Sequence, residues 1–320
     1  MSDTRCDLCG DSSCSVISDT DRHGQPLTTV MCDNCGLVRH RDIPSEEELR
    51  EFYSTNYREE YNGERIPGPR RIMRAWNNGL RICRQISNHL PSGGSVFEVG
   101  AGIGCTVKVF ERDGFAAKGI DPGGEFLKFS HDKLHADVAV GNLYDLPEDR
   151  SFDAVLLVHV IEHLRSPKLA LLKIATLLKP GGLFYVECPN LSAPFARRSQ
   201  LFHTAHIHNF VPATLRMLAE STGYRLRQRF GDERDPNLQM LFEYTGQCQL
   251  NVDPENVPRT LQELQRSDTL PYLARPRYLV DRARKLASYG EEHLRARSFV
   301  ADLISTCQSA KREQEARRAA

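Results

Sequence analysis

Residues 95–110, SVFEVGAGIGCTVKVF, place a short apolar run directly before a glycine-rich turn and a second run with helical spacing. Glycine lets the backbone adopt conformations that other residues disfavour, and it lets a ligand approach the main chain closely. The stretch therefore predicts a strand over 95–100, a ligand-binding turn, and a helix over 103–113. The alternative interpretation is a turn that needs glycines only for its own geometry.

The spacing of the glycines separates two kinds of ligand. Gly100, Gly102 and Gly104 follow one another as GxGxG, whereas the dinucleotide fingerprint GxGxxG would require glycine at Cys105. Asp121 ends the next predicted strand, where a carboxylate can accept hydrogen bonds from the hydroxyls of a ribose. We therefore expect a ribose-bearing ligand that is not a dinucleotide.

Strands and helices alternate from residue 93 to about residue 245. Further strands are predicted at 115–120, 137–140, 153–159, 182–187, 224–230 and 238–245, and further helices at 123–131, 167–178 and 212–222. Such alternation implies a parallel sheet covered by helices on both faces. The predicted fold class is therefore α/β.

Three further regions flank this core, which is consistent with two or three folded units in 320 residues. Residues 1–43 hold five of the ten cysteines and few side chains that could form a core. Residues 44–92 are predicted to be a helical linker or lid that begins with Ser45 as an N-cap. Residues 246–320 are predicted to be a helical, Arg-rich C-terminal extension.

Composition excludes several classes of protein. Lys and Arg together number 42, as do Asp and Glu, so a globally basic nucleic-acid binder is not indicated. No apolar run approaches the roughly 18–20 residues of a membrane span. The polar start MSDTRCDLCG lacks the apolar segment of a signal peptide. We therefore expect a cytoplasmic protein whose cysteines are not paired in disulfides.

Two cysteine pairs near the N-terminus predict a structural metal site. The four thiols, in two CxxC motifs that are each followed by a glycine, are Cys6, Cys9, Cys32 and Cys35. This pattern is typical of a closed zinc site, in which four thiolates leave no position for a catalytic water. Cys14 and His40 are possible alternative ligands, but neither fits the paired spacing. We expect zinc to supply much of the folding free energy of this segment.

Taken in order, these motifs resemble those of the class I S-adenosylmethionine-dependent methyltransferases. Beyond the glycine turn, the likeness extends through GNLYDLP (141–147), SFDAVLLVHVIEHL (151–164) and LLKPGGLFYVECPN (177–190). It covers roughly residues 93–245. The resemblance implies a Rossmann-like sheet of seven strands with a reversed last hairpin, and S-adenosylmethionine as cofactor.

The same resemblance implies roles for particular residues. The implied cofactor-binding residues are Glu98, Gly100, Gly102, Gly104, Asp121, Asn142, Leu143 and His159. The glycines would lie against the methionine part of the cofactor, Asp121 would bind the ribose, and Asn142 and Leu143 would flank the adenine. His159 would line the pocket, and Glu98 would order the turn through its amides.

The cysteine pairs and the following PSEEELREFYSTNY (44–57) narrow the resemblance. Together with the core they resemble the zinc-ribbon methyltransferases of sugar and polysaccharide biosynthesis, including the sugar C-methyltransferases. This chain departs from the latter in its shorter helical C-terminus and in having Ala205-His206 where they have a Glu-His pair. Because deprotonating carbon asks more of a base than deprotonating a hydroxyl, the missing carboxylate favours a hydroxyl acceptor.

A group of histidines after the fifth predicted strand provides candidate bases. Methyl transfer to a hydroxyl is an in-line displacement, and a general base accelerates it by about 10²–10⁴-fold. The candidate catalytic residues are His206, His203, His208 and His163. Of these, His206 matches the position used in the family. A surface or packing role is the alternative for each of them. Metal binding by His203, His206 and His208 is disfavoured, because no carboxylate lies at a usable spacing in the sequence.

The sequence thus predicts a methyltransferase that O-methylates a hydroxyl of a sugar, a glycan or a glycosylated metabolite. Arginines on the predicted helix near 69–88 could bind a phosphorylated acceptor, although a solvated charged face is the simpler interpretation. A possible homo-oligomer would form through the C-terminal helices.

Three alternatives to this function remain open. One is C-methylation of a nucleotide-linked keto-sugar. Another is RNA methylation, which the zero net charge disfavours. The third is a regulatory protein that binds the cofactor without catalysis.

Overall fold

The computed structural model describes residues 5–49, 66–193, 196–275 and 278–319. The chain divides into two compact units. The first comprises Met1–Leu49, Glu148–Ser151 and Leu157–Tyr278, and the second comprises Arg50–Pro147, Phe152–Leu156 and Leu279–Ala320. Each unit is described below by itself.

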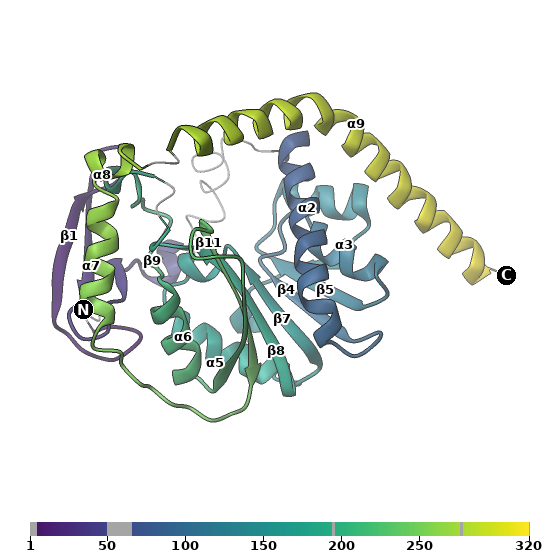
Figure 1. Cartoon of the computed structure of the whole chain (residues 1–320). Coiled ribbons are helices and arrows are strands. Elements are labelled where there is room, and N and C mark those ends of the chain that lie inside the picture. The colour runs from purple at the N-terminus through teal and green to yellow at the C-terminus, as the bar shows by residue number, and fades with distance from the viewer. Residues whose placement is uncertain (1–4, 50–65, 194–195, 276–277, 320) are drawn as a thin grey trace. The chain divides into compact units, whose positions relative to one another are not determined.

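The strands and helices follow the alternation expected from the sequence (Figure 1). The strands are β1 (Cys14–Thr20), β2 (Pro26–Cys32), β3 (Val38–His40), β4 (Ser95–Val99), β5 (Ala116–Asp121), β6 (Val138–Val140), β7 (Phe152–Val158), β8 (Leu178–Pro189), β9 (His208–Asn209), β10 (Tyr224–Phe230) and β11 (Asn237–Tyr244). The α-helices are α2 (Pro69–Ile86), α3 (Cys105–Arg112), α4 (Glu125–Phe129), α5 (Pro167–Leu177), α6 (Pro212–Ser221), α7 (Asn256–Arg266), α8 (Thr269–Leu273) and α9 (Tyr278–Ala319).

Seven strands form the main sheet, in the order β10-β11-β8-β7-β4-β5-β6. Strands β4, β5 and β6 pair in parallel. The last hairpin is reversed, because β11 runs antiparallel to both β8 and β10. The predicted α/β class, the seven strands and the helical C-terminus are confirmed. Strand β8 starts at Leu178, earlier than the predicted 182, and it includes the KPGG sequence, in which Gly181 has a φ of +73°.

A second sheet of four strands, β1-β2-β3-β9, belongs to the first unit. Its first three strands come from the cysteine-containing N-terminal segment, and its fourth comes from the histidine segment, residues 202–209. The apolar side chains that pack between them are Met31, Val38, Leu191, Leu201, Phe202, Val211 and Leu264. The N-terminal segment and the histidine segment therefore share one sheet and one core.

The second unit packs α2 against α3 beside strands β4–β6 (Figure 1). The predicted apolar stripe of α2 is buried at Ile72, Trp76 and Cys83. Gly79 lies in the same stripe. Its lack of a side chain allows α2 to approach α3 closely, since a Cβ at this position would lie 3.0 Å from the Thr106 Cα. The opposite face is charged, and Arg74 forms an ion pair with Glu292 of α9.

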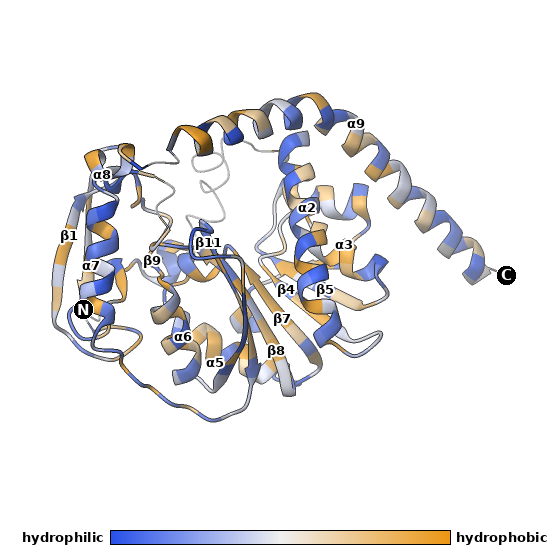
Figure 2. Ribbon diagram, in the orientation of Figure 1, coloured by the Kyte–Doolittle hydropathy of each residue, from blue (hydrophilic) through white to orange (hydrophobic). Residues whose placement is uncertain are grey.

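Figure 2 shows apolar strands at the centre of the main sheet and mixed hydropathy along α9. Within the described ranges, no helix is long and apolar enough to cross a membrane. The predicted N-cap of the linker is present, since Ser45 and Glu48 exchange hydrogen bonds in a capping box. Most of the linker that follows, residues 50–65, lies outside the described residues.

Candidate functional site

The glycine turn after β4 adopts the conformations that the sequence predicted. Gly100, Gly102 and Gly104 have φ values of +75°, +52° and +75°, in the region that other residues rarely adopt. A side chain at Gly104 would collide with the hydroxyl of Ser130 and approach Ala136 within 3.1 Å. The turn therefore needs glycine for its backbone angles and, at Gly104, for space as well.

Asp121 connects this turn to the end of β5. Its Oδ2 accepts a hydrogen bond from the Gly102 amide at 2.9 Å, and its Oδ1 accepts one from the Gly123 amide at 3.1 Å. The main-chain oxygen of Asp121 in turn accepts a bond from Gly141 at 3.0 Å. The next residue, Asn142, uses its Oδ1 to accept from the Tyr144 amide at 3.0 Å. These contacts place the Gly102 turn, Asp121 and Asn142 together in the second unit.

Glu98 lies beneath the turn and is almost completely buried. Burial raises the pKa of its carboxyl to about 8, although hydrogen bonds from the Thr106 side chain and the Val107 amide oppose this shift. Both partners belong to the first turn of α3 rather than to the glycine turn itself. Leu143 is likewise buried. His159, the remaining residue implied by the resemblance, follows β7 and belongs to the first unit.

The four predicted thiols converge at one point in the first unit. The Sγ atoms of Cys6 and Cys35 are 3.5 Å apart, as are those of Cys9 and Cys32, and all four lie within 4.8 Å of one another. These separations are too long for disulfide bonds. They fit the edges of a tetrahedron with zinc–sulfur bonds of about 2.3 Å.

The two CxxC loops have the same local structure. Gly10 donates to the Cys6 oxygen at 2.8 Å and Gly36 donates to the Cys32 oxygen at 2.9 Å, and both glycines have positive φ. Asn256 of α7 caps the second loop, because its Nδ2 donates to the oxygen of Cys35 at 2.7 Å. The paired loops, with their preformed turns, fit a zinc ribbon.

Asp7 anchors the cysteine loops to α5, a role that sequence reasoning missed. Its carboxylate accepts hydrogen bonds from the Ser166 hydroxyl at 2.7 Å and from the Lys168 amide at 2.8 Å, at the start of that helix. An acidic residue at this end of a helix also complements the helix dipole. The only signal in the sequence is that an acid lies inside the first CxxC motif, and it does not identify the helix.

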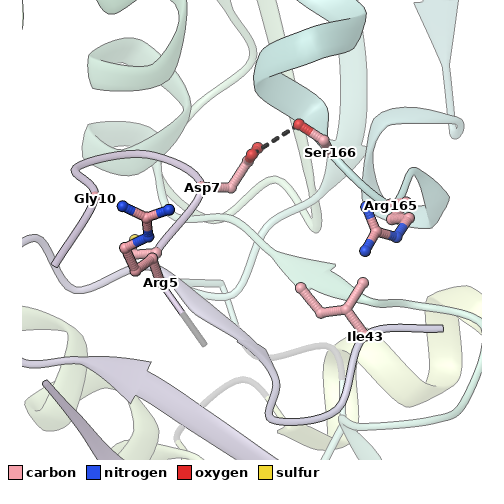
Figure 3. A pocket seen from close by; sticks show the side chains of 7 residues that line it. Arg5, Asp7, Gly10, Ile43, Arg165 and Ser166 are labelled. Carbon is pink, nitrogen blue, oxygen red and sulfur yellow. Dashed lines mark hydrogen bonds between the residues drawn. The ribbon is translucent and has the colours of Figure 1, made fainter. Parts of the chain in front are cut away.

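A cavity of about 250 Å³ lies beside this anchor (Figure 3). It is lined by Arg5, Cys6, Asp7, Gly10, Ile43, Arg165 and Ser166. The lining contains neither the glycine turn nor any candidate catalytic histidine. The cavity is therefore separate from both the glycine turn and the candidate catalytic histidines.

The N-terminal segment holds the histidine segment by main-chain hydrogen bonds. His40 donates its amide hydrogen to the Ile207 oxygen at 2.9 Å, and Arg22 donates to the Phe202 oxygen at 2.7 Å. The His40 Nε2 lies 3.2 Å from the His203 oxygen, which requires a proton on that nitrogen. His208 is itself part of strand β9 and is completely buried.

Burial keeps these histidines neutral. It lowers the pKa of His203 and of His208 to about 3, and it lowers that of His206 well below the ordinary value. For His206, the Arg22 guanidinium and any protonated form of His163, His203 or His159 act in the same direction. Near neutral pH, the imidazoles of this segment are therefore unprotonated.

Glu162 brings the remaining candidate, His163, together with His206. The Glu162 Oε1 lies 3.7 Å from the Nε2 of His163 and 3.9 Å from the Nε2 of His206. The same oxygen lies 3.5 Å from the Nδ1 of His159. The structure thus gathers the histidine that follows β7 and two of the predicted bases around one buried carboxylate. His208 lies apart from this group, in the four-stranded sheet.

His159 combines exposure with an unusual backbone. Its φ is +54°, which a residue other than glycine seldom adopts outside turns and functional sites. Its side chain is 39% exposed, and its Nε2 lies 3.7 Å from the Glu187 Oε1. Among the histidines around Glu162, it presents the most surface.

Known methyltransferases are similar to this chain in sequence. A family model described as a methyltransferase domain matches residues 71–229. The ubiquinone biosynthesis O-methyltransferase of Xanthomonas axonopodis pv. citri is 28% identical over 189 residues, which is 53% of this chain and 78% of that protein. A probable S-adenosylmethionine-dependent methyltransferase of Mycolicibacterium smegmatis is 28% identical over 158 residues, which is 49% of this chain and 62% of that one.

Among solved structures, the 1,6-didemethyltoxoflavin-N1-methyltransferase of Burkholderia thailandensis aligns with a TM-score of 0.49 and 16% identity. The alignment covers 65% of this chain and 96% of that one. The sheet order, the glycine turn with its carboxylate, and the family match together lead to one conclusion. Residues 71–229 are a methyltransferase domain, and the chain is an S-adenosylmethionine-dependent methyltransferase.

Proposed function

We propose that this enzyme transfers a methyl group to a hydroxyl of a sugar, a glycan or a glycosylated metabolite, with His206 as the general base. The observation that carries the proposal is the buried cluster in which His206 and His163 lie within 4 Å of the Glu162 carboxylate. A neutral imidazole beside a carboxylate is suited to taking a proton from an acceptor hydroxyl.

The cofactor residues are those of the glycine turn and its neighbours. When bound, S-adenosylmethionine supplies a methyl group on a positively charged sulfur. The Gly100–Gly104 turn offers main-chain contact without side chains, and Asp121 offers a carboxylate for the ribose hydroxyls. Each of its oxygens accepts one hydrogen bond, from the amide of Gly102 or of Gly123, and a carboxylate oxygen can accept a second one. Asn142 and Leu143 then flank the adenine, and His159 borders the methyl group.

The reaction balances with the groups named. The acceptor oxygen gives up its proton to an imidazole nitrogen of His206 and forms a new bond to the methyl carbon. The bond between that carbon and sulfur breaks, and its electron pair stays on sulfur to leave the neutral thioether. The proton on His206 is released to water before the next cycle.

The four candidate bases differ in their burial and in their hydrogen-bond partners. His208 is completely buried and donates its Nδ1 hydrogen to the Leu164 oxygen at 3.1 Å, so we assign it a structural role in the four-stranded sheet. His163 donates through Nδ1 to the Ala205 oxygen at 2.7 Å. His203 lies beside His206, with ring centres 3.8 Å apart. His206 contacts the Glu162 carboxylate and has the position that the resemblance implies, whereas His163 and His208 each use a ring nitrogen to bond a main-chain oxygen; this supports its choice.

The choice of oxygen and of a carbohydrate rests on different grounds. The Xanthomonas relative is named as an O-methyltransferase, which supports an oxygen acceptor. The paired cysteine loops beside a methyltransferase core support a sugar or glycan, by the resemblance to the zinc-ribbon enzymes of carbohydrate biosynthesis. C-methylation of a keto-sugar stays the second candidate, because Glu162 supplies His206 with a carboxylate although its sequence neighbour is Ala205.

The metal in this proposal is structural zinc. Cys6, Cys9, Cys32 and Cys35 would hold it, and it would fix the two loops that contact α5 and α7. With four thiolates on the ion, no position is open for water or substrate. The zinc therefore acts on the fold and takes no part in methyl transfer.

The test supplies the full-length protein with methyl-labelled S-adenosylmethionine and a fractionated lysate of its source organism. We expect label in a nucleotide-sugar or glycan fraction, on an oxygen that NMR identifies as a methyl ether. Label on a sugar carbon would establish the second candidate instead. Ribonuclease-sensitive label would overturn the carbohydrate proposal, and cofactor binding without any labelled fraction would overturn the proposed function.

A further inference from the structure

In the first unit, the buried carboxylate of Glu162 is surrounded by imidazoles. The side chain of Glu162 is 2% exposed. Neither of its oxygens accepts a hydrogen bond from any residue that the structure describes. An ionised carboxylate buried without a partner costs several kcal/mol, so such groups are normally paired with a cation or protonated.

His163 does not supply that cation through the ring nitrogen that faces Glu162. The His163 Nδ1 lies 2.7 Å from the Ala205 oxygen, which can only accept, so Nδ1 carries the ring hydrogen of the neutral imidazole. Its Nε2, 3.7 Å from the Glu162 Oε1, then holds a lone pair. A lone pair faces a carboxylate oxygen with no hydrogen between them.

We infer that Glu162 is a positioning residue that makes the cluster accept the proton released by the acceptor. When His206 takes this proton, the charged ring lies beside Glu162, with its Nε2 3.9 Å from the Glu162 Oε1, and the carboxylate stabilises the positive charge. The long distance agrees with this order of events, because catalytic hydrogen bonds are often loose before substrate binds and tighten afterwards. This inference rests on the proposed role of His206.

The sequence explains why the carboxylate comes from elsewhere in the chain. The residue before His206 is Ala205, which has no acid to offer, and no other acid lies in 202–209. Glu162 reaches the cluster from the short helical turn Ile161–His163 after β7. Two segments far apart in the chain therefore combine to make one acid–base pair.

Burial alone lowers the pKa of His206 well below its ordinary value, which would make it a weak base. Glu162 is an acidic group that faces this ring, and the other titratable or charged groups around the ring include His163, His203, His159 and Arg22. Removing the carboxylate should therefore lower the proton affinity of the cluster further. Glu162→Gln makes this change at constant shape, and Glu162→Asp keeps the charge.

The first measurement needs no acceptor. Ring NMR of labelled histidines follows protonation of the cluster in the full-length protein as the pH falls. We expect Glu162→Gln to lower the pKa of the titrating imidazole by about 1–3 units. The matched control is Glu243→Gln on β11, whose carboxylate pairs with Arg225 and should leave that titration unchanged. An unchanged titration in Glu162→Gln, or a cluster that takes up no proton while the protein is folded, would overturn the inference.

The second measurement uses the acceptor fraction that wild-type protein labels. Glu162→Gln should transfer methyl groups about 100-fold more slowly, with unchanged affinity for S-adenosylmethionine. The acidic limb of its pH–rate profile should be displaced to lower pH. Glu162→Asp should retain most of the rate. Equal rates in wild type and Glu162→Gln would contradict the inference while leaving the proposed function intact.

Metal analysis completes the test, since Glu162, His163 and His206 could also hold a divalent cation. We expect one metal per chain, retained in Glu162→Gln. A second equivalent that this variant loses would replace the acid–base pair with a metal site and overturn the inference.

Discussion

Arg39 of β3 and His208 of β9 are direct partners in the four-stranded sheet, and Val38 pairs with Asn209 beside them. Two strands from distant parts of the chain thus form one ladder. Because His206 lies two residues before the start of β9, the position of the proposed base is tied to the fold of the cysteine loops. The ribbon, meaning residues 5–40 with these loops, serves as a support for the histidine segment.

Removing the metal should therefore stop methyl transfer without abolishing cofactor binding. Cys35→Ser removes one of the four sulfurs, and treatment with a chelator removes the ion. Either change should destabilise the ribbon, because metal binding supplies much of its folding free energy. We expect the rate to fall by about 10²–10⁴-fold, the contribution of a positioned base. Calorimetry should show that S-adenosylmethionine affinity stays within a few-fold, because Gly102 and Asp121 belong to the other unit.

The control for this experiment is Cys248→Ser. Cys248 is an exposed thiol outside the cluster, and its replacement should change neither the metal content nor the rate. If Cys35→Ser kept full activity after complete loss of metal, the ribbon would not support the histidine segment.

The buried histidines should make the protein lose stability as the pH falls. Burial lowers the pKa of His40 to about 4 and those of His203 and His208 to about 3, against an ordinary value of 6.5. Between these values the unfolded chain binds more protons than the folded chain, so the free energy of unfolding decreases with decreasing pH. From pH 7.5 to 5.5, each of the three should cost about 1.3 kcal/mol.

Urea unfolding at the two pH values measures this loss. His208→Asn removes one of the three groups and keeps a donor for the Leu164 oxygen, so the pH dependence should shrink by about 1.3 kcal/mol. The exposed His293→Ala serves as the control and should leave the dependence unchanged. A pH dependence that is the same in His208→Asn and wild type would show that His208 is not held neutral by burial.

Much of the fold could be predicted because its signals are local. The glycine turn, the caps and the apolar runs each lie within a few residues, and every strand expected between 93 and 245 is present. The four thiols were equally predictable, because CxxC spacing by itself brings each pair of sulfurs together. Zinc and cofactor contacts at these positions remain predictions.

The pairing of distant segments could not be predicted in this way. Strand β9 has two residues and no alternating pattern, so nothing in the sequence indicates that it completes the ribbon sheet. Glu162 was visible only as the neighbour of His163, whereas its contact with His206 depends on how the main sheet places both segments. Asp7 and Asn256 share this property, since each makes a contact between the cysteine loops and a helix that is distant in the sequence.

Asp121 should be essential for cofactor affinity. Asp121→Asn keeps the shape but removes the charge that strengthens a bond to a ribose hydroxyl, and charge-assisted hydrogen bonds contribute about 1.5–3 kcal/mol. We expect the Kd for S-adenosylmethionine to rise by about 10–100-fold in calorimetry. Asp137→Asn, at an exposed carboxylate near Lys118, should leave the Kd unchanged. Wild-type affinity in Asp121→Asn would remove Asp121 from the ribose site.

Gly104 and Gly114 allow the two demands on a glycine to be separated. Both have positive φ, of +75° and +92°, so alanine at either position carries the backbone penalty of about 1 kcal/mol. Only Gly104 also lacks space, because its new methyl group would collide with Ser130, whereas nothing lies within 4 Å of that position at Gly114. Gly104→Ala should therefore lower the free energy of unfolding by about 1–3 kcal/mol more than Gly114→Ala, the usual cost of overpacking. Gly104→Ala should also weaken S-adenosylmethionine binding, since the turn must move to make room, and Gly114→Ala should not. Equal losses of stability and equal affinities in the two variants would mean that the turn tolerates the side chain, and that it is not the rigid cradle proposed for the cofactor.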